Sequence, residues 1–232
     1  MWMCGYSAIL AELRTRSVEM TQTPATLRRI PGKHRIGLRD YDSDCFWNEL
    51  LDRSGDEILA DIERCGIGDG PFYERLAAAT LIKSLGDLVD LSLVRTRFPC
   101  GGGFGDIELP ICLELLSGPK YRLWERWQIM FRVKSIMVEC KNMRRRAGVG
   151  EVAQLLTYMV TARRGRLGML VSRSGFSKNA LHRLARIADG DEYLILPLDG
   201  EDLQHLATKD RRNAREVMTF FRQKENMLVR AA

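Results

Sequence analysis

The chain has 232 residues, of which 45% are apolar and 28% charged, with 36 Lys and Arg against 30 Asp and Glu. This length and composition suit a folded protein of about one domain and exclude general disorder. No segment approaches the roughly 20 apolar residues of a membrane-spanning helix, and the apolar residues 1–10 lack the features of a signal peptide, so we expect a cytoplasmic protein that does not bind membranes.

The six cysteines and three histidines are scattered along the chain, without a C-x-x-C pair or a regular spacing. Zinc sites in proteins need closely spaced pairs of these ligands, so a structural zinc site is not expected. Free and mostly buried thiols in a reducing compartment are the favoured interpretation.

The N-terminal part of the chain has weak patterns and is expected to contain short helices. The sequence favours a helix over residues 8–20 and two short helices over 42–51 and 57–65. Glycine and proline over 66–71 then mark a break in the chain. We therefore expect residues 1–70 to form a small helical region, to which the sequence assigns no role.

The main domain is expected to begin at Pro71 with a long helix, because proline is tolerated in the first helical turn. Apolar residues recur with helical spacing over 71–93. Apolar and polar residues alternate over 106–115, which indicates a strand, and Pro110 favours an edge position or a bulge for it. Two further strands are expected over 127–132 and 135–141.

Helices and strands alternate in the rest of the chain. The patterns predict a helix over 152–160, a strand over 167–172, a helix over 177–188 with Ser177 as N-cap, a strand over 193–198, and helices over 199–207 and 213–224. This order predicts an α/β fold with a central mixed sheet flanked by helices on both faces. The core domain is expected to span 71–207, with 208–232 as a C-terminal helix packed on it.

Positive charge is concentrated in one stretch of the sequence. Residues 117–189 carry 16 Lys and Arg against 4 Asp and Glu, a local net charge of +12 in a protein whose net charge is +6. Twelve of these 16 cations are arginines, whose planar guanidinium forks onto phosphate oxygens. The stretch therefore favours a polyanionic partner such as nucleic acid.

Two carboxylates and one ammonium group are candidates for chemistry. Asp106 begins one expected strand, and Glu139 and Lys141 share one face of another. If these strands are neighbours, the carboxylates can bind a hard divalent cation such as Mg²⁺, which polarises a phosphate and activates a bound water. The lysine can orient or deprotonate that water, or stabilise the pentavalent anion.

The segments around these residues resemble a known superfamily. They are Gly103-Phe-Gly-Asp106-Ile107, Ile136-Met-Val-Glu139-Cys-Lys141, Gln154-Leu-Leu-Thr-Tyr158, and two downstream stretches over 174–180 and 196–203. Together they are similar to the PD-(D/E)XK nucleases, and most like Mrr-like restriction endonuclease domains, over residues 71–207. The proline that usually precedes the first acid is absent. The Gly-Ile-Asp context of Mrr-like enzymes would select Glu108 instead, so Glu108 is the second choice for this metal ligand.

The resemblance implies a restriction-endonuclease-like fold and a Mg²⁺-dependent endonuclease, with Mn²⁺ able to substitute. It implies Asp106 and Glu139 as metal ligands and Lys141 as the residue that positions the attacking water. The substrate would be DNA, and the setting restriction or defence against phage. RNA as substrate, a homodimer and a partner subunit of a defence system stay open.

Further candidates surround this set. Gln154 is expected to assist catalysis by a hydrogen bond to a metal ligand or a DNA strand, and Tyr158, one helical turn away, is expected to bind DNA. Five arginines are expected to bind DNA: Arg144, Arg145, Arg146, Arg163 and Arg164. Glu74 is considered because some relatives use a helical glutamate near a second metal, but a plain solvent-exposed glutamate is the favoured interpretation. The alternative to a nuclease is a catalytically inactive module on the same fold that binds nucleic acid or an acidic protein.

Overall fold

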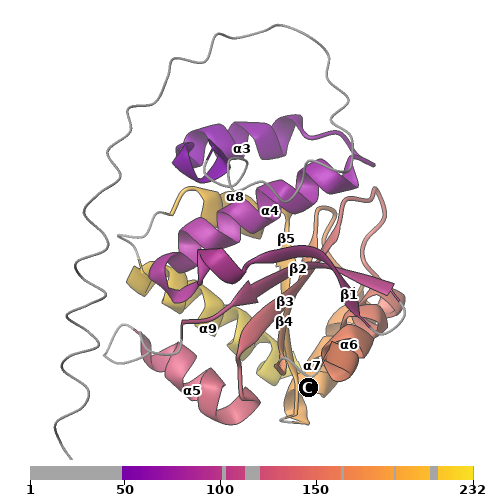
Figure 1. Cartoon of the computed structure of the whole chain (residues 1–232). Coiled ribbons are helices and arrows are strands. Elements are labelled where there is room, and N and C mark those ends of the chain that lie inside the picture. The colour runs from indigo at the N-terminus through magenta and orange to yellow at the C-terminus, as the bar shows by residue number, and fades with distance from the viewer. Residues whose placement is uncertain are drawn as a thin grey trace, which may run out of the picture. The chain divides into compact units, whose positions relative to one another are not determined.

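The computed structural model describes residues 49–100, 103–112, 121–162, 165–190, 192–209 and 214–231 (Figure 1). All of them belong to one compact unit, residues 39–232. The helix expected over 8–20 and most of the one expected over 42–51 lie outside the described residues. Within these ranges, none of the helices combines the length and the apolar character that crossing a membrane requires.

A five-stranded mixed sheet forms the centre of the fold, with the strands in the order β1-β2-β3-β4-β5. The strands are β1 (Arg95–Cys100), β2 (Gly103–Pro110), β3 (Ser135–Lys141), β4 (Leu167–Ser172) and β5 (Leu194–Asp199). The first three pair antiparallel, and β3, β4 and β5 pair parallel. The sheet therefore combines an antiparallel hairpin with a parallel half, which confirms the expected mixed sheet.

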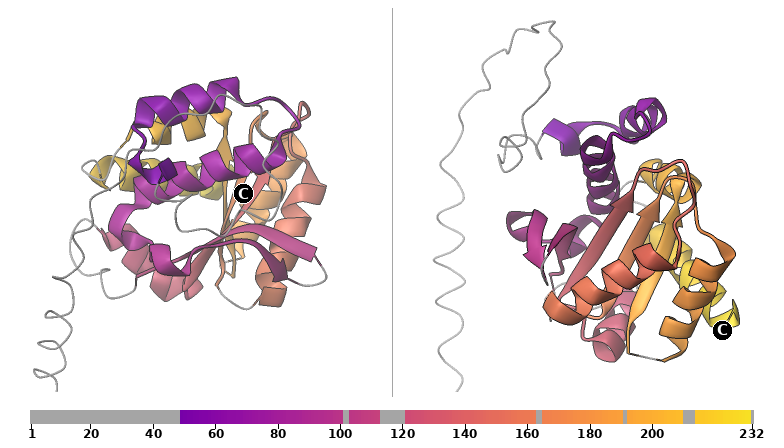
Figure 2. Two further views of the ribbon diagram at one scale, coloured as in Figure 1. Left: turned by 45° about the horizontal axis from the view of Figure 1, so that its top comes forward. Right: turned by 90° about the vertical axis from the view of Figure 1, so that its right-hand side faces the viewer.

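Helices cover both faces of this sheet. They are α3 (Gly55–Arg64), α4 (Gly70–Leu85), α5 (Arg122–Phe131), α6 (Val149–Ala162), α7 (Lys178–Asp189), α8 (Gly200–Ala207) and α9 (Ala214–Ala231), with 3-10 turns η1 (Gly86–Leu88) and η2 (Leu91–Leu93). In Figure 2, α3 and α4 lie on one side of the sheet, and α6 and α7 on the other. The crossovers through α6 and α7 connect parallel strands, as such connections require. The α/β fold with helices on both faces is confirmed.

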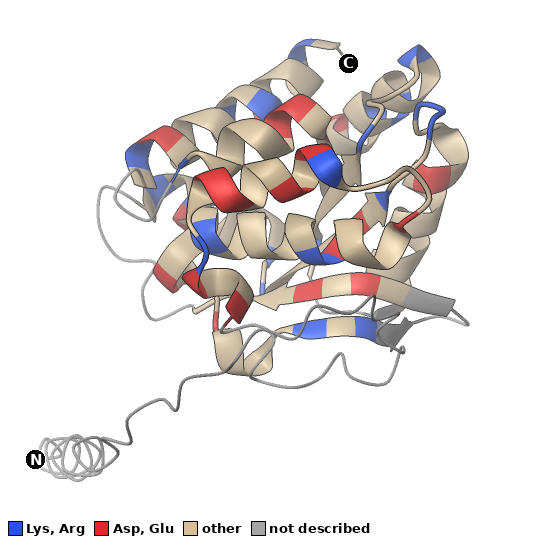
Figure 3. Cartoon of the chain, turned by 90° about the horizontal axis from the view of Figure 1, so that it is seen from above, with Lys and Arg blue, Asp and Glu red and all other residues tan. Residues whose placement is uncertain are grey.

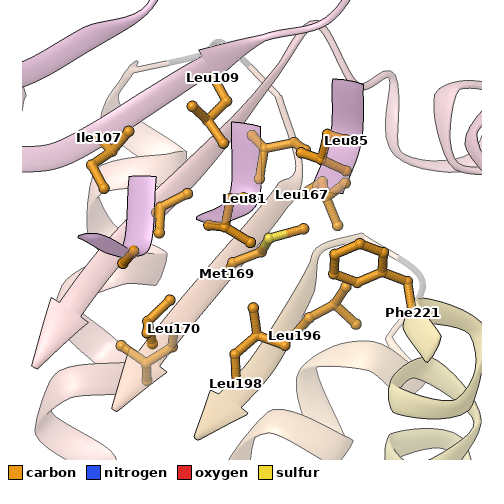
Figure 4. Packing of buried hydrophobic residues seen from close by; sticks show 14 of the residues in the cluster. Leu81, Leu85, Ile107, Leu109, Leu167, Met169, Leu170, Leu196, Leu198 and Phe221 are labelled. Carbon is orange, nitrogen blue, oxygen red and sulfur yellow. The ribbon is translucent and has the colours of Figure 1, made fainter. Parts of the chain in front are cut away.

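The core lies mainly between α4 and the sheet. Leu81 and Leu85 of α4 approach Ile107 and Leu109 of β2, and all four side chains are buried (Figure 4). Because side chains alternate across a strand, this burial directs Asp106 and Glu108 to the other face. The apolar half of β2 thus fixes where its two acids lie.

Several local predictions are confirmed. The expected elements over 135–141, 152–160, 167–172, 177–188, 193–198 and 199–207 correspond to β3, α6, β4, α7, β5 and α8. The Ser177 hydroxyl accepts the N–H of Ala180 at 3.2 Å, as expected of an N-cap. The last helix, expected over 213–224, continues to Ala231. The domain boundary at residue 71 stays a prediction, and α3, which precedes it, contacts α4 and α8.

The strand predicted over 127–132 is wrong, because this segment belongs to helix α5. Trp127 and Phe131 are buried, whereas Ile129 between them is 75% exposed. A strand would place these three residues on one face, so the burial follows the helical period of 3.6 instead. The ring centroids of Trp124 and Trp127 lie 5.9 and 6.5 Å, respectively, from the ring centroid of Phe221 of α9. This packing explains why the short amphipathic segment is helical.

The region between α4 and β3 also differs from expectation. The helix expected over 71–93 ends at Leu85, where Gly86 has a φ of 58°. The sequence patterns missed β1, which pairs antiparallel with β2. The strand expected over 106–115 runs from Gly103 to Pro110, and residues 113–115 lie outside the described part. Pro110 is not on an edge strand: it is the last residue of the interior strand β2, where a missing N–H costs least.

Candidate functional site

The structure brings Asp106, Glu139 and Lys141 together. The ladder between β2 and β3 pairs Ile107 with Val138, so the residues beyond this pair, Asp106 and Glu139, lie on neighbouring strands and on one face. The Asp106 carboxylate accepts the N–H of Cys140 at 2.7 Å, and the Lys141 ammonium donates to Glu139 Oε1 at 2.5 Å. Two carboxylates and one cation thus meet near the C-terminal end of β3.

Burial and mutual repulsion perturb these groups. Glu139 is 1% exposed, and burial together with the Asp106 charge raises the pKa of the Glu139 carboxyl to about 7. Burial also raises the pKa of Asp106, although the Cys140 N–H opposes this. Burial disfavours the charge on Lys141, but the hydrogen bond and charge of Glu139 outweigh it and raise the pKa of Lys141. Lys141 is therefore held in its charged ammonium form, next to two carboxyl groups whose raised pKa values favour the protonated form.

A third carboxylate, Glu74 of α4, is close enough for its charge to interact with Asp106 and Glu139. The N-terminus of α4 is tied to the end of β3, since the Asn142 amide donates to the carbonyl of Gly66 at 2.7 Å and the carbonyl of Asn142 accepts the N–H of Gly68 at 3.3 Å. Glu74 is half-buried there, and burial and the Asp106 charge raise its pKa to about 7. The interpretation of Glu74 as a plain exposed glutamate is therefore wrong.

The carboxylates fit a divalent cation. Glu139 Oε2 is buried and has no hydrogen-bond partner, which leaves one oxygen available while Oε1 holds Lys141. Across the described part of the chain, no three His, Cys, Asp or Glu side chains are arranged as a complete metal site. Mg²⁺ does not need one, because it is usually held by one or two carboxylates and keeps water or substrate phosphate as its other ligands.

Glu108, the second choice for the metal ligand, lies two residues after Asp106 on β2, further from the end of β3 that carries Lys141. Its cross-strand neighbours are Met137 on β3 and Arg95 on β1, whereas Asp106 lies next to the end of β3. The Glu108 side chain is 2% exposed. The geometry therefore favours Asp106 over Glu108 as the partner of Glu139.

Gln154 and Tyr158 form a pair on α6. The Gln154 amide donates to the Tyr158 hydroxyl at 2.8 Å, one helical turn away, and both side chains are half-buried. Among the described residues, neither makes a hydrogen bond to Asp106, Glu139 or Lys141. The structure thus joins this pair to each other and not to the three charged residues.

The basic loop after β3 is only partly free for a ligand. Arg144, Arg145 and Arg146 are all exposed, but Arg145 forms an ion pair with Glu151 in the first turn of α6. Arg145 is therefore less available to DNA than its two neighbours. The loop itself is ordered by a bridge between Ala147 and Phe176.

The structure does not test the two remaining predicted cations. Arg163 and Arg164 fall outside the described residues. Their neighbour Arg166 lies 3.8 Å from the Glu192 carboxylate and 5.8 Å from the centroid of the Tyr193 ring. The sequence pattern does not distinguish these arginines from ordinary solvent-exposed charges.

A cavity of about 490 Å³ borders Arg146, between the ends of β4 and β5 and helix α9. Its charged lining includes Asp202 and Lys224, which form an ion pair with each other. Asp202 also closes the capping box of α8 with Asp199. Asp199, Asp202 and Lys224 are thus engaged in the fold, and neither Asp106 nor Glu139 lines this cavity.

Comparison with known proteins gives one family match. Residues 127–207 match the Mrr_cat family model, which describes a restriction endonuclease. None of the curated proteins and none of the solved structures matched the chain. The matched residues run from within α5 to the end of α8 and include Glu139 and Lys141, whereas Asp106 and Glu74 lie before them. Residues 127–207, which include β3, β4 and β5 of the sheet, are therefore similar to the restriction endonucleases that this family model describes.

Proposed function

We propose that this protein is a metal-dependent endonuclease that hydrolyses phosphodiester bonds of DNA. The observation that carries the proposal is the meeting of Asp106, Glu139 and Lys141 on two neighbouring strands, with one buried oxygen of Glu139 unpartnered. The restriction-endonuclease match over residues 127–207 supports the same reaction class.

In this proposal Asp106 and Glu139 hold Mg²⁺, or Mn²⁺ in its place. The bound cation would offset the charge of the phosphate and lower the pKa of a water molecule. The Cys140 N–H holds one oxygen of Asp106 and the Lys141 ammonium holds one oxygen of Glu139. Each carboxylate is therefore oriented through one oxygen, which reduces the rearrangement needed when a ligand binds.

Lys141 has two roles open to it in this arrangement. Its ammonium is fixed on Glu139, so its remaining N–H groups can orient the attacking water or stabilise the negative charge that develops on the phosphate. Its raised pKa favours the charged form, which suits charge stabilisation better than proton abstraction. When it is ionised, Glu74 adds a third negative charge and would increase the attraction for cations at this site.

The DNA backbone would lie over the loop after β3. Arg144 and Arg146 are exposed and five or fewer residues from Lys141, and in the described part of the chain neither forms an ion pair. Arg145 contributes less, because Glu151 already neutralises it. Gln154, Tyr158, Arg163 and Arg164 remain proposed contacts to DNA, and restriction or defence against phage in the cytoplasm remains the proposed setting.

Cleavage assays test the proposal. Supercoiled, linear and single-stranded DNA and an RNA are incubated with Mg²⁺, Mn²⁺ or EDTA. We expect metal-dependent cleavage of DNA that Asp106→Asn, Glu139→Gln and Lys141→Met abolish. Glu125→Gln, which changes an exposed acid of α5, is the matched control and should cleave like the wild type.

The outcomes separate the alternatives. Salt-sensitive DNA binding without cleavage in any metal would identify a catalytically inactive binding module. Cleavage that survives Glu139→Gln or Lys141→Met would contradict the assigned site. Loss of cleavage in Glu108→Gln, with retention in Asp106→Asn, would make Glu108 the metal ligand.

A further inference from the structure

Two arginines have a left-handed backbone. Within the described ranges, Arg97 and Arg132 are the non-glycine residues with positive φ, and both have a φ of 49°. This conformation is unfavourable for L-residues with a Cβ atom. Arg132 is the C-cap of α5, where helices commonly end in this conformation. Arg97 lies within β1, so no helix end explains its backbone.

The position of Arg97 is defined by the register of β1 and β2. Thr96 pairs with Ile107 and Phe98 pairs with Gly105, so the register is the same on both sides of Arg97 and no residue is inserted. Arg97 therefore lies opposite Asp106. Since β1 is the edge strand next to β2, this arginine borders the carboxylates on the side away from β3. Figure 3 shows the basic positions of β1 beside the acidic positions of β2.

The positive charge of Arg97 interacts with the carboxyl groups of Asp106 and Glu74, although among the described residues Arg97 forms no ion pair with either. Burial is the main cause of the raised pKa of Asp106 and of Glu74, and the Arg97 guanidinium lowers both values. Arg97 is nevertheless exposed, and within the described residues it makes no hydrogen bond or ion pair. An arginine near two carboxylates would normally pair with one of them, so its donors remain available to another anion.

We propose that Arg97 binds the two non-bridging oxygens of the phosphate that is cleaved, from the side of Asp106 opposite to Lys141. This inference rests on the proposed nuclease function and adds a residue to its site. In hydrolysis the water oxygen bonds to phosphorus, one P–O ester bond breaks, one water proton passes to solvent and the leaving oxygen takes up a proton. Negative charge grows on the non-bridging oxygens during this exchange, and a guanidinium stabilises it without losing a proton.

The backbone of Arg97 is consistent with such a role. Residues in sparsely populated conformations persist only where the surroundings impose them, and they cluster at ligand-binding and active sites. Arginine also suits the task better than lysine, because its planar fork matches two phosphate oxygens. A strand position with an unfavourable φ, an unpaired guanidinium and Asp106 opposite it combines these features in one residue.

Arg97→Asn and Arg132→Asn form a matched pair for the test. Both replace an exposed arginine with the same φ, and asparagine tolerates the left-handed region. In single-turnover cleavage with enzyme in excess, we expect Arg97→Asn to lower the rate about 100-fold, as the loss of a charge-stabilising donor does elsewhere. Arg97→Lys should retain part of the rate, and Arg132→Asn should stay within about twofold of the wild type. Thermal unfolding should show both asparagine variants folded.

A wild-type rate in folded Arg97→Asn would overturn the inference. If Arg97→Asn does not fold, Arg97→Lys decides, and a wild-type rate in that variant counts against bidentate phosphate binding. If the wild type itself does not cleave, the proposed function fails separately. DNA affinity in EDTA then tests Arg97 alone: loss of one phosphate contact lowers the slope of log affinity against log salt by about 0.9. An unchanged slope in Arg97→Asn would exclude the contact.

Discussion

Glu139→Gln is expected to stabilise the metal-free protein at neutral and alkaline pH. The folded-state pKa of Glu139 is raised from 4.5 to about 7, chiefly by burial and then by the Asp106 charge. The folded protein therefore binds this proton more tightly than the unfolded chain, and the free energy of unfolding falls as pH rises from the unfolded pKa to the folded pKa. Glutamine has nearly the same size and removes the charge.

The magnitude follows from the size of the shift. At about 1.4 kcal/mol per pKa unit, the Glu139 carboxylate costs about 3 kcal/mol at pH 8 and almost nothing at pH 4. The amide oxygen of glutamine can still accept the Lys141 hydrogen bond. We therefore expect the stability of Glu139→Gln relative to the wild type to increase by about 2 to 3 kcal/mol between pH 4.5 and pH 8.

Urea unfolding in EDTA at a series of pH values measures this difference, with the buried Trp124 and Trp127 as fluorescent reporters. Glu57→Gln is the control with opposite sign. Hydrogen bonds from the Ser54 N–H and hydroxyl lower the pKa of the exposed Glu57, so that carboxylate stabilises the fold above its unfolded pKa and the gain is lost as pH falls. A stability difference between Glu139→Gln and the wild type that does not change with pH would refute the reasoning.

Three further predictions concern metal, DNA and packing. At a Mg²⁺ concentration 100 times its dissociation constant, the free energy of unfolding of the wild type should rise by about 2.7 kcal/mol. An unfolding temperature that does not change with Mg²⁺ in calorimetry would argue against a metal site. Replacing Arg144 and Arg146 by alanine should flatten the slope of log DNA affinity against log salt by about 1.8, equally for all sequences, in fluorescence anisotropy titrations; an unchanged slope would move the DNA path elsewhere. Gly55→Ala should destabilise the protein by about 1 to 3 kcal/mol in urea unfolding, because the added Cβ would lie 2.2 Å from the carbonyl oxygen of Ala207. Gly66→Ala is the control, because a Cβ at that position meets nothing within 4 Å. Equal stability of these two variants would contradict the packing of α3 on α8.

Local sequence patterns determined much of the fold on the C-terminal side of the site. The strands β3, β4 and β5 are short apolar runs bounded by turns, and α7 begins at a serine whose hydroxyl caps it. Such signals operate over a few neighbouring residues, so they can be read without knowing what packs against them. The alternation along β3 also places Glu139 and Lys141 on one face, as the structure has them.

Only the tertiary structure decided which distant residues accompany them. The charges of Glu74 and Asp106 interact because α4 is tied to the end of β3, and no local pattern around Glu74 predicts that interaction. Arg145 forms an ion pair with Glu151 and is therefore less available to DNA. Helix α5 is helical because Trp124 and Trp127 pack on α9 rather than on a neighbouring strand. The position of Arg97 opposite Asp106 depends on the register of two strands, one of which has no clear pattern of its own. The physical reason is common to all four cases: periodicity and capping act between neighbours in the chain, whereas burial, charge pairing and strand register depend on residues that only folding brings together.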